Sequence, residues 1–267
     1  MKRLVSKFAL RAVMFFNAIV MSFQVQALVY SVNQGDSVAF ANAIKMANAS
    51  PEADVIELAG GVYVLRGAFQ GKDGWAALPV IAGQLLIRGA HAEVRAYTHR
   101  SLHLLEVAAD AALKIEGVTL AEGTNGALVN YGRTELRGVA VIDQTTRSAP
   151  AIISNYGDLT LARCELSFNT ISAAQNAGTI INYGFVAINN TRIRGNLVSR
   201  RYESLVLASV LLNYGVAELH HVSILDNEAV SDSQDLSMSG VADALINQGV
   251  GSMKVSFVTS TNNFPGN

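Results

Sequence analysis

Short runs of alternating hydrophobic and polar positions recur along the second half of this chain. Each run opens on two mostly apolar residues and closes on a unit of asparagine, an aromatic residue or glutamine, and glycine. The five copies are Asn130-Tyr131-Gly132, Asn155-Tyr156-Gly157, Asn182-Tyr183-Gly184, Asn213-Tyr214-Gly215 and Asn247-Gln248-Gly249. Alternation over a few residues is typical of β-strands, and a self-similar period in the twenties to thirties is typical of a stacked coil.

Further positions recur at fixed distances from each glycine. Four residues later stand Leu136, Leu161, Ile188, Leu219 and Met253, and five residues beyond these stand Val141, Leu166, Ile193, Ile224 and Val258. Three residues further come Gln144, Asn169, Asn196, Asn227 and the pair Thr261-Asn262. These repeats predict an all-β, single-domain, right-handed parallel β-helix whose coils occupy residues 79–267.

The segment before the coils predicts a cap. Asp36 is a natural N-cap for a helix over residues 37–48, in which Phe40, Ile44 and Ala47 fall on one face, and Pro51 follows its end. We expect this amphipathic helix to cover the open end of the first coil, because an unshielded edge exposes unpaired backbone groups. Residues 28–78 then hold the cap helix and the first strands, over 55–58 and 62–65.

Residues 1–27 have the features of a secretory signal peptide. Basic residues precede an apolar run from Ala12 to Phe23, and Val25-Gln26-Ala27 places small residues where a signal peptidase cuts. We expect a mature chain that begins near Leu28 and is exported to the periplasm, the cell surface or the medium. A permanent membrane anchor is the alternative for this segment, and no later stretch approaches a membrane span.

The composition narrows the classes of function that remain possible. Half of the residues are apolar and the formal net charge is −1 without a stripe of Lys or Arg, which argues against a nucleic-acid partner. Cys164 is the single cysteine, so a disulfide framework is excluded and stability comes from stacking. No motif indicates a cofactor or a metal site, and we expect neither.

A family resemblance accompanies these patterns. The cap around Asp36-Ser37, the stretch Ala53-Asp54-Val55-Ile56-Glu57-Leu58 leading to Gly61-Val62-Tyr63, the Leu78-Pro79 segment and the Asn-x-Gly coils resemble bacterial exported right-handed parallel β-helix proteins. These are pectin-lyase-like in fold, and the chain is similar to the subset whose cap carries a Cys-Ser-Leu-Arg-Glu-Ala motif. Here the cap keeps the serine but has neither the cysteine nor the Arg-Glu pair. The resemblance implies a surface or secreted protein and supplies no catalytic residue.

The recurrent amides predict two structural ladders. Inward asparagines of successive coils lie one rung, about 4.8 Å, apart and can hydrogen-bond to one another. The first ladder contains Asn130, Asn155, Asn182, Asn213 and Asn247, and the second contains Asn169, Asn196 and Asn227.

Alternation turns Tyr131, Tyr156, Tyr183 and Tyr214 outward in a stripe. Stacking between neighbouring rungs explains such a stripe structurally, and a platform for sugar rings explains it functionally. The glycine spacings of 25, 27, 31 and 34 residues also place steadily longer loops on one side, over residues 145–150, 170–178, 197–209 and 228–243. One loop tip, Arg200-Arg201-Tyr202, is a second candidate binding element.

Fold relatives that cleave acidic polysaccharides need clustered carboxylates. The closest outward pair is Glu135 and Asp158, one rung apart and offset by two residues, on the order of 8 Å, a separation that suits an inverting glycosidase. Arg133 should stack on Asp158, however, which favours a surface ion-pair patch.

Three functions therefore remain open. The leading hypothesis is an exported, non-enzymatic binding or scaffold protein that contacts polysaccharide or another surface component. The runner-up is a polysaccharide lyase or glycoside hydrolase with Glu135 and Asp158 as catalytic candidates. The third is a structural module whose last rung associates with a partner or a second copy, unless Phe264 folds back to cover it.

Overall fold

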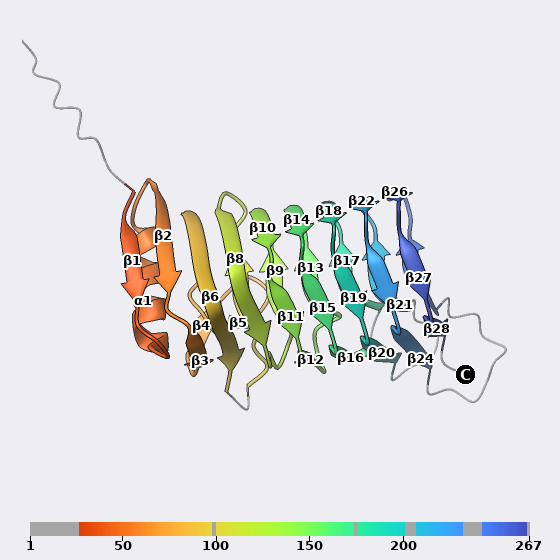
Figure 1. Ribbon diagram of the computed structural model, residues 1–267, viewed down its shortest axis with the longest axis horizontal. Helices are drawn as coiled ribbons and strands as arrows, with labels where there is room; N and C mark the ends of the chain where they lie inside the picture. Colours follow the sequence, from red (N-terminus) through yellow and green to blue (C-terminus); the bar gives the residue numbers. More distant parts are fainter. Residues whose placement is uncertain (1–26, 98–99, 174–175, 201–206, 232–241, 266–267) are drawn as a thin grey trace, which may run out of the picture.

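The computed structural model describes residues 27–97, 100–173, 176–200, 207–231 and 242–265. The chain forms a parallel β-solenoid of about 7 turns, with 57% of residues in strands and one helix. Figure 1 shows the coils side by side along the long axis, from β1 and α1 at the red end to β26 and β27 at the blue end. Residues 1–26, with most of the expected signal peptide, lie outside the described part.

Each regular coil contributes one strand to each of four rows, and the strands within a row pair in parallel. Row 1 contains β1 (Val29–Val32), β2 (Ala53–Leu58), the first part of β6 (Gln84–Ala96), the first part of β8 (Ala112–Ala121), β10 (Arg133–Arg137), β14 (Asp158–Ala162), β18 (Phe185–Asn189), β22 (Val216–His220) and β26 (Ser252–Ser256). Row 2 contains β3 (Gly61–Leu65), the second parts of β6 and β8, β11 (Ala140–Ile142), β15 (Glu165–Ser167), β19 (Arg192–Arg194), β23 (Ser223–Leu225) and β27 (Thr259–Thr261). Row 3 contains β12 (Thr145–Thr146), β16 (Thr170–Ala173), β20 (Leu197–Arg200), β24 (Glu228–Ser231) and β28 (Phe264–Pro265). Row 4 contains β7 (Leu105–Val107), β9 (Leu128–Asn130), β13 (Ala151–Asn155), β17 (Ala177–Asn182), β21 (Leu207–Asn213) and β25 (Ala242–Asn247).

The Asn-Tyr-Gly units form the corner between row 4 and row 1. The asparagine side chains point inward, and Nδ2 of each donates to Oδ1 of the next over 2.7 Å, from Asn130 through Asn155, Asn182 and Asn213 to Asn247. Each amide from Asn130 to Asn213 also reaches the carbonyl of its own corner glycine and a carbonyl of the following coil. Backbone N–H groups of the next coil already bond to the corner glycine carbonyls, so the ladder gives these carbonyls a second hydrogen bond and satisfies its own buried amides. The first predicted ladder is confirmed.

The corner glycines are required by a close backbone approach between coils. A Cβ on Gly157, Gly184 or Gly215 would lie 2.1 Å from the carbonyl oxygen of the corner glycine one coil earlier. None of these three has a positive φ, so the constraint is space rather than backbone conformation. A side chain at this corner would push successive coils apart.

Two further corners use left-handed backbone at residues of unrelated types. Between rows 1 and 2 the residues with positive φ are Gly61, His91, Gly117, Gly138, Arg163, Asn190, His221 and Phe257. Between rows 2 and 3 they are Glu122, Asp143, Phe168, Gly195, Asp226 and Asn262. The second amide ladder follows the latter corner, where Asn169 Nδ2 donates to Asn196 over 2.8 Å and Asn196 Nδ2 donates to Asn227 over 2.7 Å. This predicted ladder is also confirmed, and Asn227 continues it to Asn263.

The register predicted for the last coil is wrong by two residues. Val216 pairs with Ser252, so Gly251 rather than Gly249 is the equivalent of Gly215. Leu219 consequently faces Val255, where we expected Met253, and Ile224 faces Ser260, where we expected Val258. The cause is a longer corner, because Gly249 and Val250 are added between Asn247 and the strand. In the second ladder the terminal amide is therefore Asn263 and not the pair Thr261-Asn262.

The helix lies at the N-terminal end of the solenoid. Helix α1 (Ser37–Asn48) begins at Asp36, whose Oδ1 accepts a hydrogen bond from Ala39 N over 2.8 Å. Its buried residues include Phe40 and Ile44, and the Phe40 ring packs edge-on against Tyr63 with centroids 6.0 Å apart. The short antiparallel hairpin of β4 (Phe69–Gln70) and β5 (Trp75–Ala76) follows the first coil.

A continuous apolar core fills the solenoid from α1 to the last described coil. The predicted inward positions Leu136, Leu161, Ile188 and Leu219 are in register and at most 1% exposed. Cys164 is buried among them, and its thiol donates to the carbonyl of Leu136 over 3.2 Å. Of the described helical residues, none form a segment with the length and apolarity that a bilayer crossing needs.

Removing one rung of the first ladder tests its contribution to stability. We expect Asn182→Ala to lower the free energy of unfolding by about 1–3 kcal/mol, because Asn155 Nδ2 and the carbonyls of Gly184 and Val216 each lose one hydrogen bond. Urea unfolding measures the change. Asn42→Ala, on the exposed face of α1, is the matched control and should leave the midpoint unchanged. Equal midpoints for the two variants would contradict the role assigned to the ladder.

A second prediction concerns the corner glycine. Gly184→Ala should destabilise the protein by about 3 kcal/mol, because the added Cβ meets a backbone oxygen of the preceding coil. Gly83→Ala is the control, since its Cβ would lie 3.3 Å from the nearest atom, the Ala47 carbonyl oxygen. Thermal unfolding should separate the two variants clearly, and a Gly184 variant as stable as the control would refute the proposed close approach.

Candidate functional site

The four predicted tyrosines form one continuous stack at the corner between rows 4 and 1. The ring centroids of Tyr131 and Tyr156 are 4.9 Å apart, and the next two pairs, to Tyr183 and Tyr214, are each 5.0 Å apart. The last two interplanar angles are both 5°. The ring spacing is that of the coils, so the backbone repeat determines it. We call these residues the tyrosine stack.

The stacking decides which part of each ring a ligand can reach. Both faces of Tyr156 and of Tyr183 are occupied by neighbouring rings, and the outer face of Tyr131 is covered by the Lys72 ammonium, 4.2 Å from the ring centroid. A sugar ring therefore cannot lie flat on the inner members of the stack. The stack presents ring edges and a row of hydroxyl groups instead.

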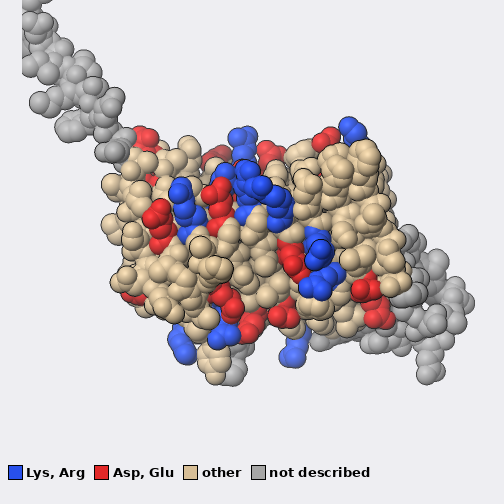
Figure 2. Space-filling model, viewed as in Figure 1, with Lys and Arg blue, Asp and Glu red and all other residues tan. Residues whose placement is uncertain are grey.

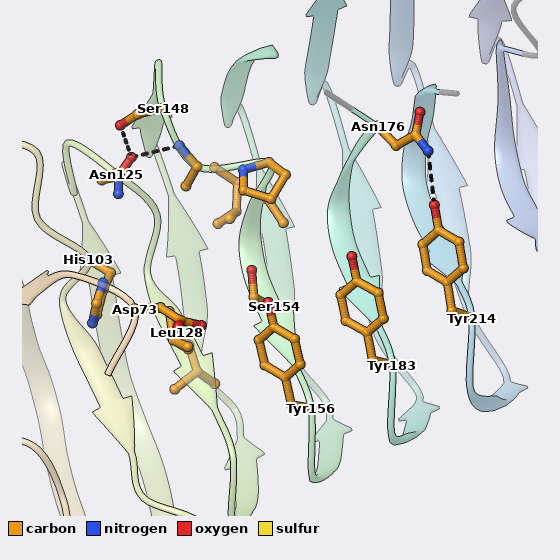
Figure 3. A pocket seen from close by; sticks show the side chains of 15 residues that line it. Asp73, His103, Asn125, Leu128, Ser148, Ser154, Tyr156, Asn176, Tyr183 and Tyr214 are labelled. Atoms are coloured by element: carbon orange, nitrogen blue, oxygen red, sulfur yellow. Dashed lines mark hydrogen bonds between the residues drawn. The ribbon is translucent and has the colours of Figure 1, made fainter. Parts of the chain in front are cut away.

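A groove of about 600 Å³ runs along the hydroxyl groups of Tyr156, Tyr183 and Tyr214. Figure 3 shows the hydroxyls of Tyr156, Tyr183 and Tyr214 pointing from one side toward the loop side that carries Asn125 and Asn176. The described residues that line the groove are Asp73, His103, Asn125, Leu128, Val129, Ser148, Ala149, Pro150, Ala151, Ile152, Ser154, Tyr156, Asn176, Tyr183 and Tyr214. Because consecutive tyrosines belong to consecutive coils, the groove crosses the coils along the solenoid axis.

Hydrogen bonds hold the loop side of the groove. Asn125 Oδ1 accepts from Ser148 Oγ over 2.7 Å and from Ala149 N over 2.9 Å, which ties two successive loops together. Further along, Asn176 Nδ2 donates to the hydroxyl of Tyr214 over 3.2 Å. The hydroxyls of Tyr156 and Tyr183 have no such bond among the described residues. They remain available to a ligand.

The hairpin between β4 and β5 closes one end of the groove. At its tip Asp73 accepts a hydrogen bond from the Tyr131 hydroxyl, beside the contact of Lys72 with the same ring. Lys72 N donates to the buried Glu106 carboxylate over 2.7 Å, and the other oxygen of Glu106 lies 3.1 Å from His103 Nε2. A Cβ on Gly71 would collide with that carboxylate, so this glycine permits the approach.

The electrostatics of the groove follow from burial and these contacts. Burial alone raises the pKa of Glu106, but the hydrogen bonds from His103 and Lys72 N and the nearby positive charges outweigh it, and the pKa is lowered. Burial, and next the charge of Asp73, raise the pKa of Tyr156. Burial, and next its two tyrosine neighbours, raise the pKa of Tyr183. The hydroxyls of Tyr156 and Tyr183 are therefore protonated donors at neutral pH.

The catalytic candidates do not line the groove. Glu135 and Asp158 occupy adjacent strands of row 1 with the predicted offset of two residues, because Arg133 pairs with Asp158. Arg133 Nε is 3.8 Å from Asp158 Oδ2, and Lys114 Nζ is 3.7 Å from Glu135 Oε1, with all four side chains substantially exposed. Figure 2 shows such groups of both signs interspersed on this side of the molecule. Asp158 also lines a hollow of about 410 Å³ that Glu135 does not line.

The predicted long loops contain a row of strands that the sequence did not reveal. The segments 145–150, 170–178, 197–209 and 228–243 each begin with a strand of row 3, so only their later parts connect to row 4. Arg200 ends β20, while Arg201 and Tyr202 lie outside the described residues. The structure thus brings together the four tyrosines and leaves Glu135 and Asp158 outside the groove, although Asp158 lines its hollow together with Tyr131.

Several groove residues escaped prediction. Asp73, His103, Asn125 and Ser148 come from the irregular part of the chain before and between the first coils. The polar segment from Arg66 to Trp75, which interrupts the strand pattern, was the only sequence feature that could have pointed to Asp73. Asn125 and Ser148 are single polar residues beside turns, so their proximity depends on the stacking of loops and not on any local pattern.

Titration of the tyrosine stack generates a pH prediction. Because the folded protein raises the pKa of Tyr156 and Tyr183, their contribution to stability is complete below about pH 10, the pKa of a free tyrosine, and is lost as pH rises through the folded pKa. Urea unfolding between about pH 8 and 11 should show this loss. The double variant Tyr156→Phe/Tyr183→Phe should lose less stability over that interval, whereas a pH profile identical to that of the parent would contradict the assignment.

The comparisons with known proteins identified no relative of this chain. No family model, no curated protein and no solved structure matches the chain. The functional conclusion therefore depends on the chemistry of the groove.

Proposed function

We propose that this protein is an exported, non-enzymatic binding module that holds an extended, hydroxyl-rich polymer, a neutral polysaccharide, in the groove beside the tyrosine stack. The observation that carries the proposal is the row of phenolic hydroxyls along one side of that groove. Hydroxyl and amide groups are the partners that sugar hydroxyls use, because each can donate and accept. A groove that crosses several coils suits a chain-like ligand better than a small compact one.

Charge favours a neutral ligand over an acidic one. Apart from the tyrosines, Asp73 and His103 are the ionisable side chains among the described residues that line the groove. A polyanion would meet the Asp73 carboxylate without a compensating row of cations, which costs binding energy. This chemistry separates the proposal from the acidic substrates of pectin-lyase-like enzymes.

The expected export and the resemblance to right-handed, pectin-lyase-like β-helix proteins are consistent with a ligand outside the cytoplasm. The resemblance also carries the alternative of a lyase or glycoside hydrolase. Glu135 and Asp158 are engaged with cations on the exposed surface of row 1, so the geometry favours binding over cleavage. Polymer length is the measurement that separates the two functions.

Binding to a panel of neutral and acidic polysaccharides tests the proposal. We expect retention of the protein in affinity gels that contain a neutral polymer, weaker retention with acidic polymers, and unchanged polymer length by size-exclusion chromatography. Tyr156→Phe and Tyr183→Phe should each weaken binding about 3- to 10-fold, since each loses one hydrogen bond worth about 0.5–1.5 kcal/mol while the stack is kept.

Tyr97→Phe is the matched control. Tyr97 is an exposed tyrosine outside the groove, with Arg66 over its ring, and its loss should leave affinity unchanged. Equal affinity for all three variants would exclude the groove as the binding site. Shortened polymer would replace the binding proposal with the enzymatic one and direct attention to Glu135→Gln and Asp158→Asn.

A further inference from the structure

A single carboxylate occupies an inward position that other coils fill differently. Asp54 is the first inward residue of β2 in row 1, and it is fully buried. The residues in register with it through the following coils are Leu85, Leu113, Thr134 and Leu159. A buried charge in this apolar stack is costly unless it has a partner.

The partner that the structure provides is the backbone nitrogen of Leu28. Leu28 N lies 2.7 Å from Asp54 Oδ1, and Leu28 O accepts a hydrogen bond from Val55 N over 2.8 Å, so Leu28 is fixed beside the carboxylate. Asp54 Oδ2 is buried and accepts no hydrogen bond. In the described part of the chain, no other buried side-chain oxygen or nitrogen lacks a hydrogen-bond partner.

Tyr30 is an ionisable group close to Asp54. Burial, next the charge of Asp54, and then a side-chain interaction with this carboxylate that lies outside ordinary hydrogen-bond geometry raise the pKa of its phenol. Tyr30 belongs to β1 and follows Leu28 by two residues. A neutral phenol supplies no positive charge, so the charge of Asp54 remains uncompensated by its described neighbours.

The sequence independently predicts a chemical change at the backbone nitrogen of Leu28. The small residues Val25 and Ala27 predict signal-peptidase cleavage between Ala27 and Leu28. Before cleavage Leu28 N is an amide, which offers one N–H and no charge. Hydrolysis adds the hydroxyl of water to the Ala27 carbonyl and a proton to Leu28 N, and the new amine takes a further proton from solvent. The resulting α-ammonium offers three N–H donors and a full positive charge, because its pKa is ordinarily about 7.7–8.0.

We propose that Asp54 is the receptor for the α-ammonium group of Leu28, so that removal of the leader creates a partly buried ion pair that stabilises the first coil. The ammonium satisfies both oxygens of Asp54, which explains why a carboxylate stands where other coils have an apolar residue or threonine. The unprocessed chain lacks the cation and has a less stable first coil. Processing and folding of the N-terminal coil are thereby coupled, independently of what the groove binds.

Two chains that differ by one residue test this proposal. A fusion protein cut immediately before Leu28 gives a chain of residues 28–267, and a second fusion gives residues 27–267, in which the ammonium lies one residue too far away. We expect the chain that begins at Leu28 to melt about 5–10 °C higher, because the longer chain leaves the buried Asp54 carboxylate without its cation. Equal melting temperatures would overturn the proposal.

Substitutions at Asp54 show whether the difference arises from this contact. In Asp54→Leu, which restores the apolar residue of the following coil, both chains should fold and melt at the same temperature. Tyr30→Phe is the control that keeps the carboxylate, and it should retain the difference between the two chains. A difference that persists in Asp54→Leu would assign the effect to Ala27 itself and contradict the ion pair.

The exported protein provides a direct check. Mass spectrometry of protein secreted from the full chain should identify Leu28 as the N-terminal residue. A mature chain that begins at another residue would remove the α-ammonium from Asp54 and refute the proposed coupling.

Discussion

The stacking of successive coils at the spacing of parallel strands is the constraint on which the rest of this structure depends. It forces every corner to repeat in register, so a polar group that is unsatisfied in one coil is unsatisfied in all of them. The Asn130 to Asn247 ladder solves this problem with side-chain amides that bond to one another and to corner carbonyls. The corner glycines permit the same approach, since Gly184 has no room for a Cβ beside the Gly157 carbonyl.

The same spacing creates the tyrosine stack and limits what it can do. Rings that repeat about every 5 Å are close enough to stack face to face, so the aromatic surface is used within the protein. What remains for a ligand is the edge of each ring, where the hydroxyls of Tyr156 and Tyr183 point into the groove. A structural and a functional role therefore coexist in one residue: the ring stabilises the stack, and the hydroxyl supplies the polar chemistry of the groove.

The residues that break the repeat include buried ionisable groups that the regular coils do not have. Asp54 replaces an apolar residue inside the first coil, and Glu106 with His103 forms a buried pair beneath the β4–β5 hairpin. Neither arrangement serves the stacking of regular coils. Each instead holds a non-repeating segment against the solenoid: Leu28 in one case and the tip with Lys72 in the other. Buried charges need specific partners, so they determine where these segments lie.

Up to the last coil, where two added residues shift the register, the sequence by itself determined the repeat, the two amide ladders and the inward apolar positions, because each depends on residue type at a fixed spacing. It also determined the alignment of Arg133 with Asp158, which follows from strand register alone. Only the tertiary structure revealed row 3 and the left-handed corners, since Arg163, His221 and Phe168 share a backbone conformation without sharing side-chain chemistry. The groove likewise depended on tertiary structure, because Asp73, Asn125 and Tyr183 are far apart in sequence and meet only when loops and coils stack.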